Sequence, residues 1–136
     1  MTMELPKNIE ENVFQVEKPW GNFRQFCLNQ QATVKILTVN PQGVLSLQDH
    51  EKRDELWHFL DDNAKVILGD KTIEPRAGSE LFIPKRTKHR LIAKDSTTKV
   101  LEVSFGHFDE NDIRRYDDQY GRIRNKEGQD KAGRIQ

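Results

Sequence analysis

The stretch that decides the fold is residues 45–59, LSLQDHEKRDELWHF, which contains the pattern Gln48-x-His50-x4-Glu55. Side chains of a β-strand alternate between its two faces, so Gln48 and His50 point to the same side. A bend after His50 can return Glu55 to that side. The stretch therefore predicts a strand, a bend and a second strand that gather three polar side chains on one face.

A second stretch, residues 78–90, reads GSELFIPKRTKHR and contains the pattern Gly78-x5-Pro84-x4-His89. A strand starting at His89 can add its imidazole to the face that holds His50 and Glu55. Two imidazoles, a carboxylate and an amide carbonyl suit a divalent first-row metal. Two histidines alone are more often unrelated polar residues on a β-protein. The paired spacing of both stretches favours a metal site.

Composition narrows the class of protein. The chain has 136 residues, enough for one domain with one core. Its 22 Lys and Arg balance 22 Asp and Glu, so there is no overall basic excess of the kind that nucleic-acid binders carry. The single cysteine, Cys27, excludes an internal disulfide and suits a reducing compartment. With no apolar run of about 18 residues and no secretory signal, we expect a cytoplasmic protein without a membrane span.

Short candidate strands separated by turn residues fill residues 13–105 and predict an all-β antiparallel barrel or jelly roll. The expected strands are Phe23 to Leu28, Thr33 to Val39, Val44 to His50, Glu55 to Leu60, Ala64 to Leu68, Lys71 to Glu74, Glu80 to Ile83, His89 to Ala93 and Lys99 to Phe105. Gly69-Asp70 reads as a two-residue hairpin turn.

The pattern changes after the last expected strand. Acidic residues at 109–112 precede Ile113-Arg114-Arg115-Tyr116, which predicts a short capped helix from Asp109 to Tyr116. We expect residues 1–12 to be a polar arm, residues 13–122 the folded domain and residues 123–136 a polar tail.

The two patterns resemble the paired metal-binding motifs of the cupin superfamily. Gln48 replaces a histidine found in many cupins and is similar to one branch, the type II phosphomannose isomerases, including the isomerase half of bifunctional mannose-1-phosphate guanylyltransferases. The similarity covers about residues 17–122. It comprises Glu17-Lys18-Pro19-Trp20-Gly21, Val34-Lys35, the string from Leu45 to Trp57, Ile83-Pro84-x4-His89-Arg90-Leu91 and the ending Asp112-Ile113-x-Arg115-x2-Asp118-x-Tyr120-Gly121-Arg122.

This resemblance implies a cupin jelly-roll barrel, a divalent metal, and interconversion of mannose 6-phosphate with fructose 6-phosphate. It assigns the metal to Gln48, His50, Glu55 and His89, and a role in isomerase activity to Arg53. Zinc is our first expectation, because it competes well for nitrogen and oxygen sites, with manganese, cobalt or nickel as alternatives. The partner is a small phosphosugar rather than a nucleic acid or a membrane, and a homodimer is left open.

The chemistry of an aldose–ketose isomerase suggests roles for further residues. Negative charge develops on two substrate oxygens, where a metal acts as a Lewis acid. Arg53 is a poor base because its pKa exceeds about 12 and suits charge stabilisation. Lys35 or a hydroxide on the metal could move the proton. For substrate binding the candidates are Arg122, Lys88, Arg90 and Trp57, although alternation turns Lys88 and Arg90 away from His89.

Departures from the family pattern keep two alternatives open. Lys52 stands where the family often has a histidine, and Ala93 where an asparagine is common. The chain could therefore be an isomerase or epimerase for another phosphosugar or a nucleotide sugar. From a different class, it could be a non-catalytic cupin that binds a sugar. The retained metal pattern and Arg53 favour an enzyme.

Overall fold

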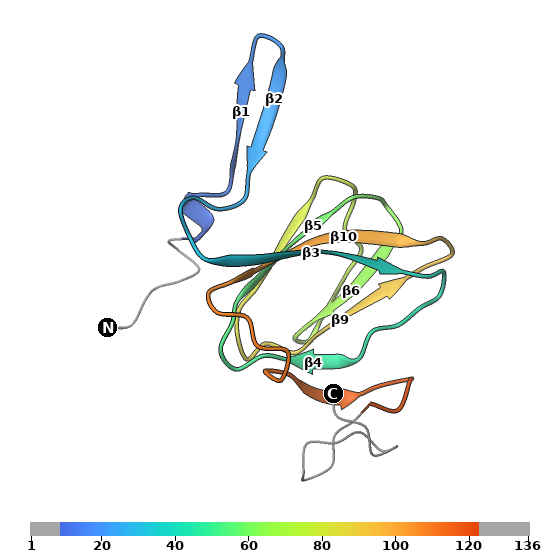
Figure 1. Cartoon of the computed structure of the whole chain (residues 1–136). Coiled ribbons are helices and arrows are strands. Elements are labelled where there is room, and N and C mark those ends of the chain that lie inside the picture. The colour runs from blue at the N-terminus through green and yellow to red at the C-terminus, as the bar shows by residue number, and fades with distance from the viewer. Residues whose placement is uncertain (1–8, 123–136) are drawn as a thin grey trace.

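The computed structural model describes residues 9–122, which form eleven β-strands after a helical turn at residues 9–11 (Figure 1). The strands are β1 (Phe14–Lys18), β2 (Gly21–Gln25), β3 (Ala32–Val39), β4 (Leu47–Asp49), β5 (Glu55–Phe59), β6 (Ala64–Leu68), β7 (Lys71–Ile73), β8 (Glu80–Ile83), β9 (His89–Ala93), β10 (Thr98–Phe105) and β11 (Arg114–Asp117).

Two antiparallel sheets make the barrel. One has the strand order β3-β10-β5-β8 and the other the order β11-β4-β9-β6-β7. Except for the β6–β7 hairpin, neighbours in these sheets are distant in sequence, as in a jelly roll, so the predicted all-β jelly-roll class is confirmed. The expected two-residue turn is also present, because Leu68 pairs with Lys71 around Gly69, whose φ is +61°. This positive φ suits glycine.

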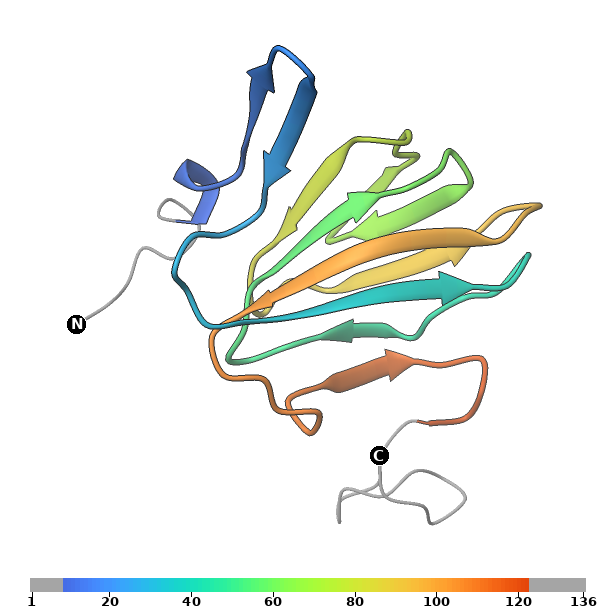
Figure 2. The same cartoon turned by 45° about the horizontal axis from the view of Figure 1, so that its top comes forward.

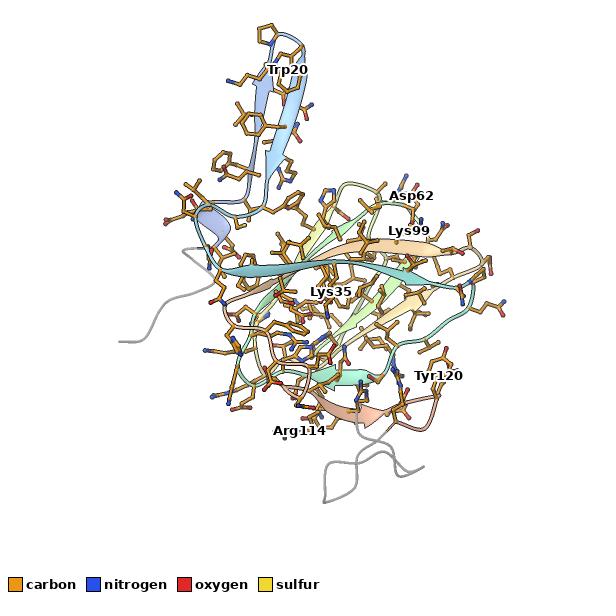
Figure 3. The ribbon with its side chains drawn as sticks, viewed as in Figure 1. Trp20, Lys35, Asp62, Lys99, Arg114 and Tyr120 are labelled. Carbon is orange, nitrogen blue, oxygen red and sulfur yellow. The ribbon has the colours of Figure 1, made fainter. Side chains whose placement is uncertain are left out.

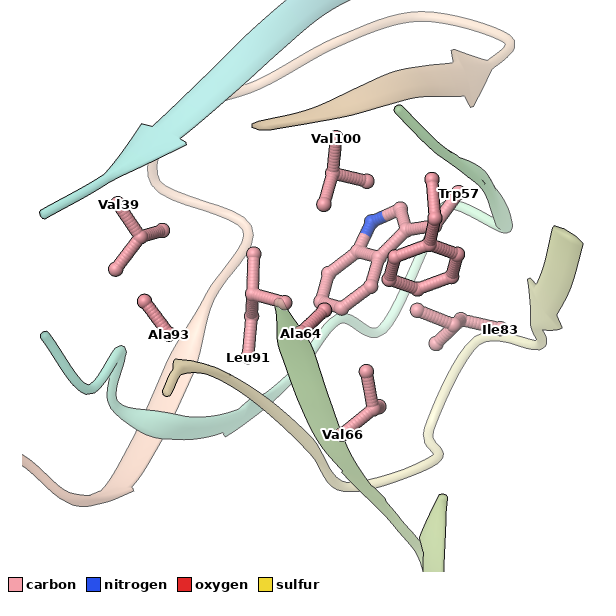
Figure 4. Close-up of a cluster of buried hydrophobic side chains, with 9 residues drawn as sticks. Val39, Trp57, Ala64, Val66, Ile83, Leu91, Ala93 and Val100 are labelled. Atoms are coloured by element: carbon pink, nitrogen blue, oxygen red, sulfur yellow. The ribbon is translucent and has the colours of Figure 1, made fainter. Parts of the chain in front are cut away.

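The core lies between the two sheets (Figure 4). Large side chains enter it from the four-stranded sheet, among them Trp57 and Phe59, both 0% exposed. Leu91 and Val66 meet them from the five-stranded sheet, again fully buried. Burial of these inward apolar side chains holds the two sheets face to face.

A second apolar cluster covers part of the outer face of the four-stranded sheet. Leu56, Val103 and Phe105 point outward from β5 and β10 and are buried under Ile9, which comes from the helical turn. Ile9 belongs to the arm expected at residues 1–12, of which residues 1–8 lie outside the described part. The expected tail at residues 123–136 also lies outside it. Within the described part, no helix is long and apolar enough to span a membrane.

The expected helix from Asp109 to Tyr116 is wrong. Asp109 does accept a hydrogen bond from the Asn111 amide at 2.9 Å, but this closes a single turn. The chain then extends as β11 and pairs with β4, with Arg114 opposite Asp49 and Arg115 opposite Gln48. The open edge of β4 thus offers hydrogen bonds that override the local helix signal.

Candidate metal centre

Three strand ends bring His50, Glu55 and His89 together. His50 follows β4, Glu55 starts β5 and His89 starts β9. Their potential ligand atoms all lie within 4.8 Å of one another. The His50 Nε2 atom is 3.3 Å from one Glu55 oxygen, and His89 Nε2 is 3.9 Å from the other. The sequence patterns predicted this juxtaposition across a bend and a distant strand.

Both imidazoles are oriented by their second nitrogen. His50 Nδ1 lies 2.7 Å from the carbonyl oxygen of Asp112, and His89 Nδ1 lies 2.8 Å from that of Thr87. A carbonyl only accepts, so each Nδ1 carries the proton and each Nε2 lone pair faces the cluster. Burial lowers the pKa of both histidines below the ordinary value, which favours the neutral rings that metals bind.

Two buried ligand atoms lack a hydrogen-bond partner among the described residues. They are Oε1 of Glu55 and Nε2 of His89, each in a side chain about 1% exposed. Burial by itself would raise the pKa of Glu55, but the surrounding His50, His89 and Arg53 hold it below the ordinary value. The cluster thus offers an ionised carboxylate and two unprotonated ring nitrogens, and two of these ligand atoms have no hydrogen-bond partner. Such a set of atoms fits a divalent cation.

Gln48 shares this face. It lies directly opposite His89 in the pairing of β4 with β9. Its carbonyl oxygen accepts a hydrogen bond from the Ser46 hydroxyl at 3.0 Å. Because a carbonyl oxygen has two lone pairs, this bond orients the amide and leaves one lone pair for another partner.

Arg53 is buried beside the cluster, with 6% exposure. Its Nε donates to Glu55 at 2.8 Å, and one terminal nitrogen lies 3.3 Å from His50 Nε2. The other terminal nitrogen donates to the carbonyl of Asp109 at 3.1 Å. The guanidinium thus touches two of the three potential ligands and adds a permanent positive charge to them.

Lys35 approaches the same region from β3. It faces into the barrel opposite Glu102 of β10, and Figure 3 shows its place beneath β3. Its Nζ lies 3.9 Å from the ring centroid of Phe108, and the guanidinium carbon of Arg53 lies 4.5 Å from the same centroid. The half-buried Phe108 therefore holds both cations by cation–π contacts.

The other expected site residues either lie away from the cluster or support it from the core. Arg90 faces outward and pairs with Asp117 at 2.9 Å, and Lys88 lies over the Tyr116 ring at 4.2 Å. Arg122 is bound to Asp118 and lines a hollow of about 350 Å³ at the opposite end of the barrel. Trp57 is fully buried and meets the His89 ring edge-on at 5.5 Å, so it supports a ligand from the core.

The two departures from the family pattern also lie outside the cluster. Lys52 is exposed, with its backbone amide bound to Asp112 at 3.1 Å. Ala93 is a core residue at the far end of β9, opposite Ala64. Ala93 is therefore not placed to contact a substrate at the cluster.

Two residues of the site were missed from the sequence. Asp112 fixes the bend after His50, because its carboxylate accepts from the amides of Glu51 at 2.9 Å and Lys52 at 3.1 Å. Glu102 is a carboxylate 7% exposed that faces the interior, and burial together with the charge of Glu55 raises its pKa to about 7. Alternation along β10 could have placed Glu102 inside; nothing local signalled Asp112.

The segment from Gly106 to Ile113 covers the cluster. Asp109 and Asp112 bond to Arg53 and His50, and Phe108 packs on Lys35 and Arg53. Glu55 and His89 are accordingly inaccessible to solvent.

Comparison with known proteins agrees with this geometry. Residues 6–118 match the family model described as mannose-6-phosphate isomerase C-terminal. The xanthan biosynthesis protein XanB of Xanthomonas campestris is 35% identical over 109 residues, which cover 79% of this chain and 23% of that protein. Mannose-1-phosphate guanylyltransferase 2 of Escherichia coli O157:H7 is 35% identical over 108 residues, which cover 78% of this chain and 22% of that protein.

Solved structures agree on the fold. A cupin protein from Bacteroides fragilis superposes with a TM-score of 0.52 at 22% identity, covering 60% of this chain and 72% of that one. The chain spans about a quarter of the length of the curated relatives it matches. The fold, the paired motifs and the family match agree with one another: this chain belongs to the family of mannose-6-phosphate isomerase C-terminal domains, with a cupin barrel.

Proposed function

We propose that the chain is a metal-dependent aldose–ketose isomerase that interconverts mannose 6-phosphate and fructose 6-phosphate. The observation that carries the proposal is the buried cluster of His50, Glu55 and His89 with Arg53 against it, in a member of this family. A module that only binds sugar has no need for unsatisfied ligand atoms in its interior.

His50, Glu55 and His89 would hold the ion, with the amide oxygen of Gln48 as a fourth candidate ligand. Zinc is our first choice for a site of two imidazoles and one carboxylate, with manganese, cobalt or nickel as alternatives. A divalent ion bound there supplies Lewis acidity to the substrate oxygens. One carboxylate among the ligands leaves a net positive site, which increases that acidity.

Arg53 would stabilise negative charge on the substrate. In the described arrangement it touches His50 and Glu55, two of the residues that would bind the ion. Its charge is permanent and its planar fork matches two oxygens at once. Lys35 contacts the same Phe108 ring as Arg53 and would add a second cation for the phosphosugar.

Glu102 joins Lys35 as a candidate proton carrier. It is buried in the barrel between Lys35 on β3 and Trp57 on β5. In the metal-free chain, burial and the charge of Glu55 raise the pKa of this carboxyl to about 7, and a carboxyl group with a raised pKa suits proton transfer at neutral pH. Arg53 cannot fill this role because it stays protonated.

The test is an isomerase assay on a small panel of hexose 6-phosphates with the metal-saturated chain, together with metal analysis of His50→Ala. We expect turnover of mannose 6-phosphate, about one ion per wild-type chain, and loss of both in the variant, since each ligand holds a large share of the site. His58→Ala is the matched control, because His58 lies on the outer face of β5.

Two results would count against the proposal. Unchanged metal content in both His50→Ala and His89→Ala would refute the site. A metal-saturated wild-type chain inert on every hexose phosphate would refute the reaction and favour a sugar-binding module.

A further inference from the structure

Lys35 points into the barrel and is half-buried there. Its neighbours on β3 show this direction, because Leu37 packs against the core while Val34 and Ile36 are 58% and 59% exposed on the opposite face. In the described part of the chain, the Lys35 ammonium makes no hydrogen bond and no ion pair. Its charge instead faces the ring of Phe108, at 3.9 Å from Nζ to the ring centroid.

The lack of an acceptor sets Lys35 apart from the other cation on this ring. Arg53 donates to Glu55 at 2.8 Å and to the carbonyl oxygen of Asp109 at 3.1 Å. Glu102 lies opposite Lys35 in the pairing of β3 with β10, yet no ion pair joins them in the described part. An ammonium carries three donors, and taking it out of water without an acceptor is costly. Lys35 thus has donors that await an acceptor.

The ring that faces Lys35 is held by backbone bonds on both sides. Gly106, with a φ of +89°, ends β10, and its amide donates to the carbonyl oxygen of Gln31 at 2.9 Å. On the other side, the Asp109 carbonyl accepts from Arg53. Figure 2 shows this segment, in orange, leaving β10 beside the start of β3 and turning towards β11. Because a ring face attracts a cation, the contact favours charged Lys35.

The two cations differ in their contacts with the potential ligands. Arg53 bonds to Glu55 and lies 3.3 Å from His50 Nε2. Lys35 has no such bond to a ligand residue in the described part. A hexose 6-phosphate likewise has two ends, with the reacting oxygens on its first two carbons and the phosphate on its last. Arg53 is placed for the reacting end, which leaves Lys35 for the phosphate.

We infer that Lys35 binds the phosphate group of the substrate and that Phe108 is the positioning residue that holds its ammonium in place. Phosphate carries close to two negative charges near pH 7 and offers acceptor oxygens to all the donors of an ammonium. With Lys35 assigned to phosphate, Glu102 remains as the candidate proton carrier. The inference rests on the proposed function for the identity of the sugar, but the anion site can be tested without turnover.

The first test is a titration of the full chain with inorganic phosphate, followed by amide chemical shifts in NMR spectra. We expect Lys35→Met to weaken phosphate binding about 10- to 100-fold, because it removes a charge-assisted contact and keeps the length of the side chain. The result should hold with and without added zinc. Lys99→Met is the matched control, since it makes the same change at an exposed position of β10 (Figure 3).

Phe108 is tested in the same titration. Phe108→Leu keeps an apolar side chain but removes the ring, and should weaken phosphate binding about 3- to 10-fold. Phe108→Tyr keeps the ring and should bind phosphate within about 2-fold of the wild-type chain. Circular dichroism checks that each variant is folded. A Leu variant that binds phosphate as well as wild type would show that Phe108 only fills space.

Kinetics separate phosphate binding from proton transfer. With mannose 6-phosphate and the metal-saturated chain, Lys35→Met should raise KM about 10- to 100-fold and change kcat less than about 3-fold. The inhibition constant of inorganic phosphate should rise by the same factor as KM. Phe108→Leu should raise both constants less, and Phe108→Tyr should restore them.

Three outcomes would overturn the inference: a wild-type chain that binds no phosphate, phosphate binding that Lys35→Met leaves unchanged, and a Lys35→Met variant with a much lower kcat at an unchanged KM. The second would mean that phosphate is held elsewhere, and the third that Lys35 moves the proton. If the wild-type chain turns over no hexose phosphate, the proposed function fails, and the titration alone decides whether Lys35 and Phe108 form an anion site.

Discussion

The two ends of the barrel are built by the same strands but differ in chemistry. Along β5 the inward residues run from Glu55 through Trp57 to Phe59, and along β9 they start at His89 and continue to Leu91. One end is thus a polar cluster and the other an apolar core, with Trp57 between them. The comparison teaches that a single strand can hold a reactive group at one end because it is anchored by packing at the other.

The two ends are also held together differently. The polar end depends on hydrogen bonds from outside the sheets, such as those of Asp112 to the bend after His50 and of Asp54 to the Lys85 amide at 2.8 Å. The apolar end depends on close packing around Phe59. Substitutions at the apolar end should therefore affect stability, and those at the polar end chemistry.

The largest expected effect is at the apolar end. Phe59→Ala removes a fully buried ring and should lower the free energy of unfolding by about 3–5 kcal/mol. Urea unfolding followed by fluorescence measures it. Leu60→Ala is the control, because this neighbour points outward and is 46% exposed. Folded Phe59→Ala should still bind its metal; loss of metal at temperatures where the chain stays folded would contradict the separation of the two ends.

The next effect is at the polar end. Arg53→Ala removes a charge-assisted contact in a buried site, so we expect about 30- to 1000-fold lower activity, or about 2–4 kcal/mol. A role on the developing charge predicts a lower kcat, whereas uniform substrate binding predicts mainly a higher KM. The metal-saturated variant should keep its ion and its fold, and Arg53→Lys should rescue poorly because the fork is lost.

The exposed Arg76→Ala serves as control for Arg53→Ala. Without metal, Arg53→Ala should also be less stable than wild type, because Glu55 loses its partner. Near wild-type kcat and KM in the metal-saturated variant would remove Arg53 from the mechanism.

The sequence predicted the positions of those side chains whose direction follows from strand alternation. The positions of Gln48, His50, Glu55 and His89 follow from strands, a bend and paired motifs. The outward direction of Lys88 and Arg90 followed from the same rule, and the contacts of Arg90 with Asp117 agree with it.

The sequence did not predict the features that depend on pairing between segments distant in the chain. The acidic start at Asp109 is a good helix signal, yet the edge of β4 draws Arg114–Asp117 into a strand. Arg122 belongs to the family ending, but its partner Asp118 and the return of β11 place it at the other end of the barrel. Contacts between residues about 60 positions apart, such as Asp112 with Glu51, leave no local pattern.

The smallest expected effect concerns Glu102, which lies near the border between the two ends. Burial and the charge of Glu55 raise its pKa from the ordinary 4.5 to about 7. The folded chain then binds more protons than the unfolded chain between these values, so this group stabilises at low pH and its contribution is lost as pH rises through 7. In the metal-free chain, Glu102→Gln should therefore gain stability relative to wild type between pH 5 and 8, on the order of 2 kcal/mol at the upper end.

Glu80→Gln should show the opposite sign. Burial opposes ionisation of Glu80, but Arg24 and His58 outweigh it and keep the pKa of Glu80 below its ordinary value. The stabilising contribution of the wild-type carboxylate is therefore present at pH 8 and is lost in the variant. Denaturant unfolding at several pH values measures both, and parallel pH profiles for Glu102→Gln and wild type would show that Glu102 does not hold its proton in the barrel.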